Sequence, residues 1–343
     1  MSSSDYHPKN SAQSIQEVVL SYLNTISLAR SANTARTYSN ALNVFQAVLN
    51  DHEVKPGETP VHELGEESVA WMINSLKDYS ATTERLYLTA VASFFEYVSA
   101  ESLSQVNLPR IRMLIHQRAR RPGQRLPQFP KDNIELVLEY AETLASIPVE
   151  NPEVRLRNLR DRAFLIILAD TGLRVHEACS MRRGDLEWNE GRAIIIGKGN
   201  RQAVVRFSRR AQTALRDYFS ARAPIDGASG KPLSSLPLFA RHDRGAGKKI
   251  KPITTATGRN IVHERTVEAL GPSAEGHITP HSFRHYFVTR VLQSSGNLKL
   301  AQELARHKNI AVTQRYAHLS DNELDQGYWK VFEEDQSENE KSV

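Results

Sequence analysis

Length, composition and charge narrow the classes of protein to which this chain can belong. It has 343 residues, more than one typical domain needs, so two domains are expected. Lysine and arginine number 44 against 39 acidic residues, and the sequence pI is about 9.2. This balance favours an anionic partner, with nucleic acid ahead of a membrane surface.

Cysteine content and hydropathy exclude further classes. Cys179 is the sole cysteine, which rules out an intramolecular disulfide and a cysteine-based metal site and fits a reducing compartment. The longest apolar run, AFLIILA at 163–169, is too short to span a bilayer. The sequence therefore predicts a cytoplasmic protein without a membrane partner.

Residues 14–107 predict a small all-α domain. Apolar residues recur at helical spacing from Ser14 onward and again after the stretch SANT, which supplies a helix cap. The stretches GEESVAWMINSLK and TTERLYLTAVASFFEYV predict two more amphipathic helices. Four helices in this length form one compact helical domain.

Residues 108–131 predict a basic linker, because this stretch is rich in arginine and proline and contains no acidic residue before Asp132. Its arginines are Arg110, Arg112, Arg118, Arg120, Arg121 and Arg125. They are the candidate DNA-contacting residues, since a strap that follows a phosphate backbone gains affinity by releasing counterions. The alternative is an ordinary solvated linker.

Residues 132–343 predict a second, mostly α-helical domain. Helical runs reach about residue 170, and RAIIIGKGNRQAVVRF then has β-branched residues on both sides of a glycine-containing turn, which is typical of a hairpin. Helical spacing returns after the hairpin. The fold class is therefore mainly α with a small β-hairpin or sheet, an α+β second domain.

The stretch HITPHSFRHYFVTRVLQSSGN predicts a helix with well-marked ends. Thr279 is its cap, Pro280 occupies its first position and Gly296 closes it. His281 and Arg284 are three residues apart in the first turn, so they share one face near the positive end of the helix dipole. This pair suits a bound phosphate, and the alternative is a polar first turn in solvent.

A second candidate pair lies in ADTGLRVHEA. Gly172 ends one helix, and Arg174 opens the next with Glu177 three residues later, placed to orient the guanidinium. An arginine fork matches a phosphate in two hydrogen bonds and stays protonated. The alternative is a surface salt bridge.

Two further residues could act in proton transfer or nucleophilic attack. Lys198 lies at the tip of the hairpin, where nearby cations could lower its pKa and make it a proton donor, although lysine is common in turns. Tyr316 follows His307 by nine residues, and a tyrosine becomes a nucleophile only where cations or a base favour the phenolate. The alternative for Tyr316 is a packed core tyrosine. The histidine spacing does not suit a metal site, so neither a metal nor a cofactor is expected.

Taken in order, these residues resemble the catalytic domain of the tyrosine recombinases, the phage integrase family of site-specific DNA recombinases. TGLRVHEA is similar to the family's first arginine box, IIIGKGNRQAVV to its lysine hairpin, TPHSFRHYFVTR to its histidine-arginine box and LARHKNIAVTQRYAHL to its histidine-to-tyrosine segment. Residues 14–107 resemble the family's core-binding domain. Arg306 departs from the pattern, because the family commonly has glycine before the histidine.

The resemblance implies a catalytic set of Arg174, Lys198, His281, Arg284, His307 and Tyr316. Tyr316 would attack a backbone phosphate and retain the 3′ end as a phosphotyrosine, with no cofactor. The two arginines would hold the phosphate oxygens and Lys198 would protonate the leaving 5′ oxygen. His281 would assist proton transfer at the tyrosine and His307 would donate a hydrogen bond to the phosphate, while Glu177 would orient Arg174.

The resemblance also implies partners and architecture. Family members close a C-shaped clamp of two domains around double-stranded DNA and act as homo-tetramers on two sites through a Holliday junction. Such a protein would be a monomer or weak oligomer when free and would associate with the nucleoid. The stretch ELDQGYWKVF would be the C-terminal exchange helix that each protomer passes to a neighbour.

Two other functions remain open at the level of sequence. A type IB topoisomerase shares the nucleophile and the phosphate clamp. A non-catalytic helical DNA-binding protein would use the tyrosine only for packing. The helical N-terminal domain and the TGLR box favour the recombinase.

Overall fold

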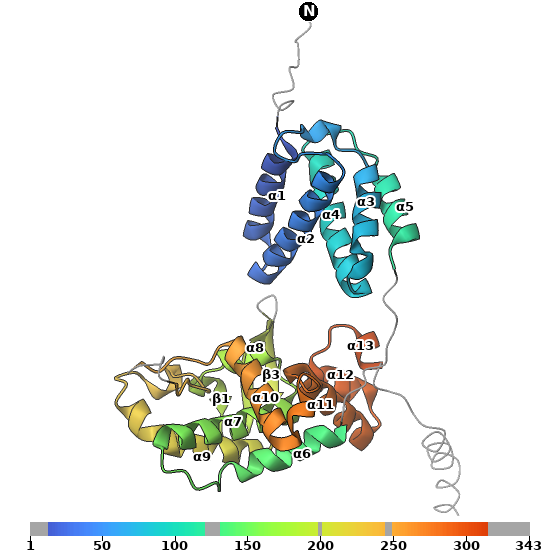
Figure 1. Cartoon of the computed structure of the whole chain (residues 1–343). Helices are drawn as coiled ribbons and strands as arrows, with labels where there is room; N and C mark the ends of the chain where they lie inside the picture. Colours follow the sequence, from blue (N-terminus) through green and yellow to red (C-terminus); the bar gives the residue numbers. More distant parts are fainter. Residues whose placement is uncertain (1–12, 121–130, 198–200, 244–248, 315–343) are drawn as a thin grey trace, which may run out of the picture. The chain divides into compact units, whose positions relative to one another are not determined.

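The chain forms two compact units, residues 1–124 and 125–343, in a computed structural model (Figure 1). The structure describes residues 13–120, 131–197, 201–243 and 249–314. Helices dominate both units, and a three-stranded antiparallel sheet lies in the second. The predicted class, mainly α with a small sheet, is confirmed.

The first unit contains helices α1 to α5 in its described part. Their bounds are α1 Ile15–Ala29, α2 Ala32–Asp51, α3 Glu67–Ser75, α4 Ala81–Ala100 and α5 Leu108–Arg118, with 3₁₀ turns at Val61–Glu63 and Leu76–Asp78. Ser14, Ser31 and Ser80 cap the first, second and fourth helices by accepting a backbone N–H from the first turn. The apolar spacing of the sequence thus folds into the predicted helices.

The core of the first unit centres on α4. Phe94 and Phe95 are fully buried there and meet Phe45 of α2 edge to face. Tyr22 of α1 packs on Phe94 with ring centroids 5.7 Å apart. Burial of these rings holds the helices together through area removed from water.

Helix α5 lies within the stretch predicted as a basic linker. Its Ile111 and Leu114 are buried in the core of the first unit, and Asn107 caps it. The first eleven residues of the predicted linker, Leu108–Arg118, are therefore folded against the N-terminal helices. This helix was not predicted, because the arginines and prolines of the whole stretch 108–131 favoured a linker, although Leu108–Arg118 itself contains more apolar residues than arginines.

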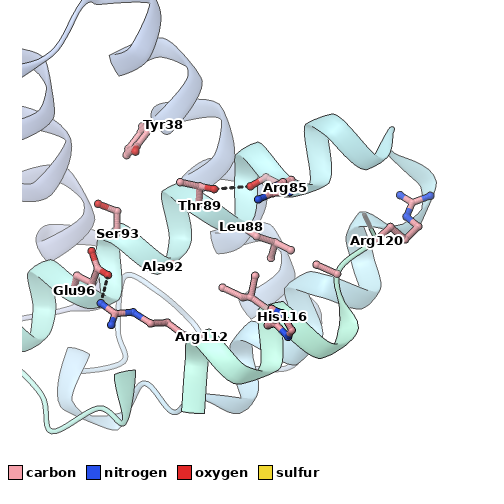
Figure 2. Close-up of a pocket in the computed structure, with 12 residues that line it drawn as sticks. Tyr38, Arg85, Leu88, Thr89, Ala92, Ser93, Glu96, Arg112, His116 and Arg120 are labelled. Carbon is pink, nitrogen blue, oxygen red and sulfur yellow. Dashed lines mark hydrogen bonds and ion pairs between the residues drawn. The ribbon is translucent and has the colours of Figure 1, made fainter. Parts of the chain in front are cut away.

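The arginines of this stretch differ in their surroundings. On one side of a pocket of about 690 Å³ between α4 and α5, the exposed Arg112 pairs with Glu96 at 2.7 Å (Figure 2). Arg110 lies 3.8 Å from Glu66, and Arg118 is the exposed last residue of α5. Arg121 and Arg125 lie outside the described residues.

Arg120 has a structural role that the sequence did not predict. Its Nε donates to the fully buried carboxylate of Glu84, its backbone N–H donates to the same carboxylate at 2.9 Å, and its Nη2 donates to the carbonyls of Leu76 and Tyr79. Burial raises the pKa of Glu84, but the Arg120 hydrogen bonds and the charges of Lys77 and Arg120 hold it below its ordinary value. Arg120 therefore ties the chain after α5 to the end of α3 and the start of α4.

Replacing Arg120 with alanine should destabilise the first unit by about 2–3 kcal/mol, because a buried carboxylate loses its main partner. The matched control is Arg112→Ala, which breaks an exposed pair and should cost less than about 1 kcal/mol. Hydrogen exchange of α4 amides in the full chain measures both. Equal effects of the two substitutions would contradict the structural role of Arg120.

The second unit contains the remaining described helices and the sheet. Its elements are α6 Lys131–Thr143, α7 Pro152–Thr171, α8 Val175–Ser180, β1 Leu186–Glu187, β2 Arg192–Gly197, β3 Arg201–Arg206, α9 Arg209–Gly227, α10 Thr255–Leu270, α11 Pro280–Ser295, α12 Leu298–Ala305 and α13 Ile310–Gln314. The strands pair in the order β1-β2-β3, with Ile194 opposite Val204. The hairpin predicted around the GKGN turn is present.

Helix α7 forms the centre of the second unit. Residues 163–169 are buried on every side, so the apolar run seen in the sequence is a core helix. The buried charges of the same helix are paired: Asp161 accepts from Arg160 at 2.8 Å and from Arg265 of α10 at 2.8 Å. A rigid α7 fixes the position of its last turn, where the candidate site begins. No helix in the described ranges is both long and apolar enough to cross a membrane.

Candidate active site

The site is built around Gly172, which closes α7. Gly172 has φ +58°, and a Cβ there would lie 2.5 Å from the ring of Phe287, so backbone conformation and space both require glycine. Its carbonyl oxygen accepts from Nη1 of Arg284 and, at 3.4 Å, from Nη2 of Arg306. The C-terminal end of α7 therefore supplies an acceptor to two guanidinium groups from distant parts of the chain.

Arg174 and Glu177 meet as their spacing predicts. Arg174 is the N-cap of α8, and its backbone N–H and its Nη1 each donate to the Glu177 carboxylate at 2.9 Å. The Glu177 side chain is 2% exposed and that of Arg174 is 43% exposed, so the guanidinium reaches solvent from a buried support. Burial raises the pKa of Glu177, but hydrogen bonds from Arg174 and the charges of Arg306 and Arg174 hold it below its ordinary value.

Helix α11 brings His281 and Arg284 to the same place. Thr279 caps it in a reciprocal capping box, Pro280 is its first residue and Gly296 closes it at φ +60°, as predicted. Arg284 is 3% exposed and donates to the carbonyls of Gly172, the C-cap of α7, and Ala305, the last residue of α12. Its position is thus set by two helix C-termini.

The histidines at the start of α11 favour the neutral state. His281 and His285 lie with ring centroids 4.1 Å apart. Burial, followed by the charges of Arg284 and Arg174, lowers the pKa of His281. Burial, His281 and Arg284 together lower the pKa of His285 to about 4. A neutral imidazole can accept a proton at neutral pH.

His307 follows α12 and is held by two local contacts. Its Nδ1 lies 2.9 Å from Oγ1 of the fully buried Thr313 of α13, and its backbone N–H donates to the carbonyl of Gln302 at 3.0 Å. This leaves Nε2 as the nitrogen that faces away from Thr313. Burial and the nearby arginines lower the pKa of His307 to about 4.

Two residues of this arrangement were not predicted from the sequence. Thr313 contacts His307, and Arg306 donates from Nη2 to Glu177 at 3.2 Å while its backbone lies in the left-handed region at φ +57°. One feature of the sequence pointed to Arg306: it stands where the family motif commonly has glycine. No feature pointed to Thr313, because a single threonine six residues after a histidine predicts nothing by itself.

The described residues thus bring together Arg174, Glu177, His281, Arg284 and His307. The charges of Arg174 and Arg284 act on both His281 and His307, so the four side chains share one electrostatic environment. With Arg306 added, two guanidinium groups contact the Glu177 carboxylate and a third, that of Arg284, contacts the Gly172 carbonyl, and the excess positive charge favours an anion. Lys198 and Tyr316 lie outside the described residues. No group of three potential metal ligands occurs in the part of the chain that the structure describes.

Comparison with known proteins identifies the family. The family described as "Phage integrase family" matches residues 129–323, and "Phage integrase, N-terminal SAM-like domain" matches residues 19–121. The chain belongs to the phage integrase family. It is a tyrosine-type site-specific DNA recombinase.

Individual relatives align with this recombinase over most of their length. It is 29% identical to tyrosine recombinase XerC of Thermodesulfovibrio yellowstonii over 89% of the chain and 92% of that protein. It is 28% identical to tyrosine recombinase XerD of Chlorobaculum tepidum over 87% and 90%. It is 30% identical to tyrosine recombinase XerC of Rhodospirillum centenum over 84% and 78%.

Solved structures share the fold of the recombinase. The XerH site-specific recombinase bound to its difH substrate matches with a TM-score of 0.61 and 19% identity, over 94% of this chain and 91% of that one. A lambda integrase dimer bound to a COC′ core site matches with a TM-score of 0.61 and 18% identity, over 89% and 96%. The likeness extends over both units.

The lowered histidine pKa values predict a loss of stability in mild acid. In the folded chain the pKa is about 4 for His285 and His307 and about 3 for His242, which burial and neighbouring arginines keep neutral. Unfolded histidines titrate near pH 6.5, so the unfolded state binds more protons and folding weakens as the pH falls from roughly 6.5 toward 5.

Hydrogen exchange of the α7 amides in the full chain, followed from roughly pH 7 to 5 and corrected for the intrinsic exchange rate, measures this loss. His285→Gln is the control variant and should show a shallower dependence. A stability that stays constant across this range would contradict neutral histidines in the folded state.

Proposed function

We propose that this recombinase cuts and rejoins duplex DNA with Tyr316 as the nucleophile, at a phosphate held by Arg174 and Arg284. The observation that carries the proposal is that Arg174 is held by Glu177 and Arg284 by the Gly172 carbonyl, while Arg306 contacts both of these supports and so links the N-cap of α8 to α11. Fixed cations that surround a developing negative charge lower the barrier of phosphoryl transfer.

The remaining roles rest on the resemblance of the motifs and, for His281 and His307, also on the contacts of the described residues. The phenol oxygen of Tyr316 forms a bond to phosphorus as the bond to the 5′ oxygen breaks, which leaves a 3′-phosphotyrosine and a free 5′ hydroxyl. His281, held neutral by its surroundings, accepts the phenol proton. His307 donates from Nε2 to a phosphate oxygen, since Thr313 occupies Nδ1. Lys198, carried between β2 and β3, protonates the leaving oxygen. The reverse attack by a 5′ hydroxyl rejoins the strand without a cofactor.

We propose double-stranded DNA as the partner of both units. The SAM-like match over 19–121 and the DNA complexes of XerH and lambda integrase support this assignment. Residues 14–107 together with α5 would form the DNA-binding domain, and residues from 132 onward the catalytic domain, closing as a C-shaped clamp. Arg110, Arg112 and Arg118 are exposed enough to exchange their present surroundings for phosphates.

We also propose a homo-tetramer on two paired sites, with exchange through a Holliday junction. The supporting relatives are recombinases of the XerC and XerD type, and the lambda integrase complex contains a dimer. The C-terminal stretch ELDQGYWKVF would dock on the neighbouring protomer; it lies outside the described residues. We propose that the protein acts in the cytoplasm in association with the nucleoid, because its proposed partner is DNA.

Substituting Tyr316 tests the nucleophile. The wild-type chain should form a covalent adduct with members of a random-sequence duplex library, visible on a denaturing gel, and sequencing the trapped DNA identifies the site. Tyr316→Phe should bind the recovered site and trap none of it, because it lacks the phenol oxygen. An adduct that persists in Tyr316→Phe would refute the assignment. Strand exchange between two copies of the recovered site separates a recombinase from a topoisomerase.

A modified leaving group tests the role of Lys198. Lys198→Ala should slow cleavage of the recovered site by about 10²–10⁴-fold, the range of general acid catalysis. A substrate with sulfur in place of the bridging 5′ oxygen should restore the rate, because a thiolate leaves without a proton. Arg174→Gln is the control and should stay slow on both substrates. Failure of sulfur to rescue Lys198→Ala would assign the lysine to binding instead.

A further inference from the structure

The backbone conformation at Arg306 suits glycine better than arginine. Arg306 closes α12 with φ +57° and ψ +42°, the left-handed conformation in which a side chain other than glycine is strained. The side chain is 12% exposed, so it points into the protein and not into solvent. A strained and largely buried arginine persists only where its contacts compensate for strain and lost hydration.

Two of the three acceptors that the Arg306 side chain contacts are supports of Arg174 and Arg284, the arginines proposed to bind phosphate. Its Nη2 donates to Oε2 of Glu177 at 3.2 Å and lies 3.4 Å from the carbonyl oxygen of Gly172, while Nη1 donates to the Leu304 carbonyl at 3.3 Å. Its Nε is buried and has no partner among the described residues. Glu177 is the support of Arg174 and Gly172 that of Arg284, so one side chain contacts both.

The two guanidinium groups on Glu177 differ in their access to solvent. Arg306 is the inner group and Arg174, with 43% of its side chain exposed, is the outer one. Among the described contacts, Arg174 uses only Nη1 of its side chain on Glu177. Arg306 offsets much of the negative charge of Glu177. Glu177 therefore reduces the positive potential at Arg174 less, and Arg174 attracts an incoming anion more strongly.

We propose that Arg306 is a positioning residue for DNA cleavage, which holds Glu177 and the Gly172 carbonyl so that Arg174 and Arg284 face the scissile phosphate. It acts through these two supports and does not touch the phosphate, because its terminal nitrogens are directed to Glu177, Gly172 and Leu304. This role rests on the proposed function, since it presupposes a phosphate at the two arginines.

Substitutions at Arg306 in the full chain test the role on the site recovered by covalent capture. Arg306→Gly suits the left-handed backbone, so it should fold and bind DNA with little change in Kd. Its single-turnover cleavage rate at saturating protein should fall by about 10–100-fold, the loss typical when a partner that orients a functional group is removed. Arg306→Lys keeps the charge and should recover part of the rate.

The pH profile gives a readout that a merely structural residue would not change. The charge of Arg306 helps to lower the pKa of Glu177. In Arg306→Gly this pKa should rise, so cleavage should be lost at a higher pH as the solution is acidified. In a Glu177→Gln background the same substitution should have little further effect, because two residues that act through one contact are not additive.

Three outcomes would overturn the role of Arg306. Arg306→Gly could cleave at the wild-type rate with the wild-type pH profile, its loss of cleavage rate could add fully to that of Glu177→Gln, or its loss could be confined to DNA binding. Full additivity would indicate that Arg306 contacts the phosphate directly. Failure of the proposed function is distinguishable, because in that case the wild-type chain itself forms no adduct through Tyr316.

Discussion

The site depends on holding like-charged guanidinium groups close together. Arg174 and Arg306 share the carboxylate of Glu177, and Arg284 and Arg306 share the carbonyl of Gly172. Such groups repel one another unless each has an acceptor, and a buried cation without one is costly. A single buried carboxylate and three carbonyls, those of Gly172, Leu304 and Ala305, provide the acceptors. The excess positive charge that remains is what an anionic phosphate would neutralise.

Helix ends supply the fixed dipoles around these cations. The C-termini of α7 and α12 present the carbonyls of Gly172 and Ala305 to Arg284, where the backbone lacks intrahelical partners and carries partial negative charge. The N-termini of α8 and α11 carry Arg174 and His281 with the opposite polarity, which favours an anion. Four helix ends thus have two roles: two accept hydrogen bonds from Arg284, and two would face the proposed phosphate. The neutral histidines among them remain able to transfer protons at physiological pH.

The arginines of the chain have different roles. Several arginines serve the fold: Arg120 satisfies the buried carboxylate of Glu84, and Arg265 satisfies Asp161 on the central helix α7. Others, such as Arg112, form exposed pairs of low energy that a phosphate can replace. A count of arginines in a segment therefore overstates its DNA contacts, because only the tertiary structure shows which cations already have buried partners.

The sequence alone determined what depends on neighbours within a turn or a strand. The sequence was enough to predict the caps of α11, the contact of Arg174 with Glu177, the β2-β3 hairpin and the order of the family motifs. Caps, turns and spacings of three or four residues act locally, so they can be recognised without the tertiary structure. Tertiary structure alone decided that residues 108–118 pack as α5, that Arg120 belongs to Glu84, that Thr313 holds His307 and that Arg306 turns inward to Glu177. Those contacts depend on how helix ends and side chains meet in the folded unit, and neither helical periodicity nor a local capping motif encodes them.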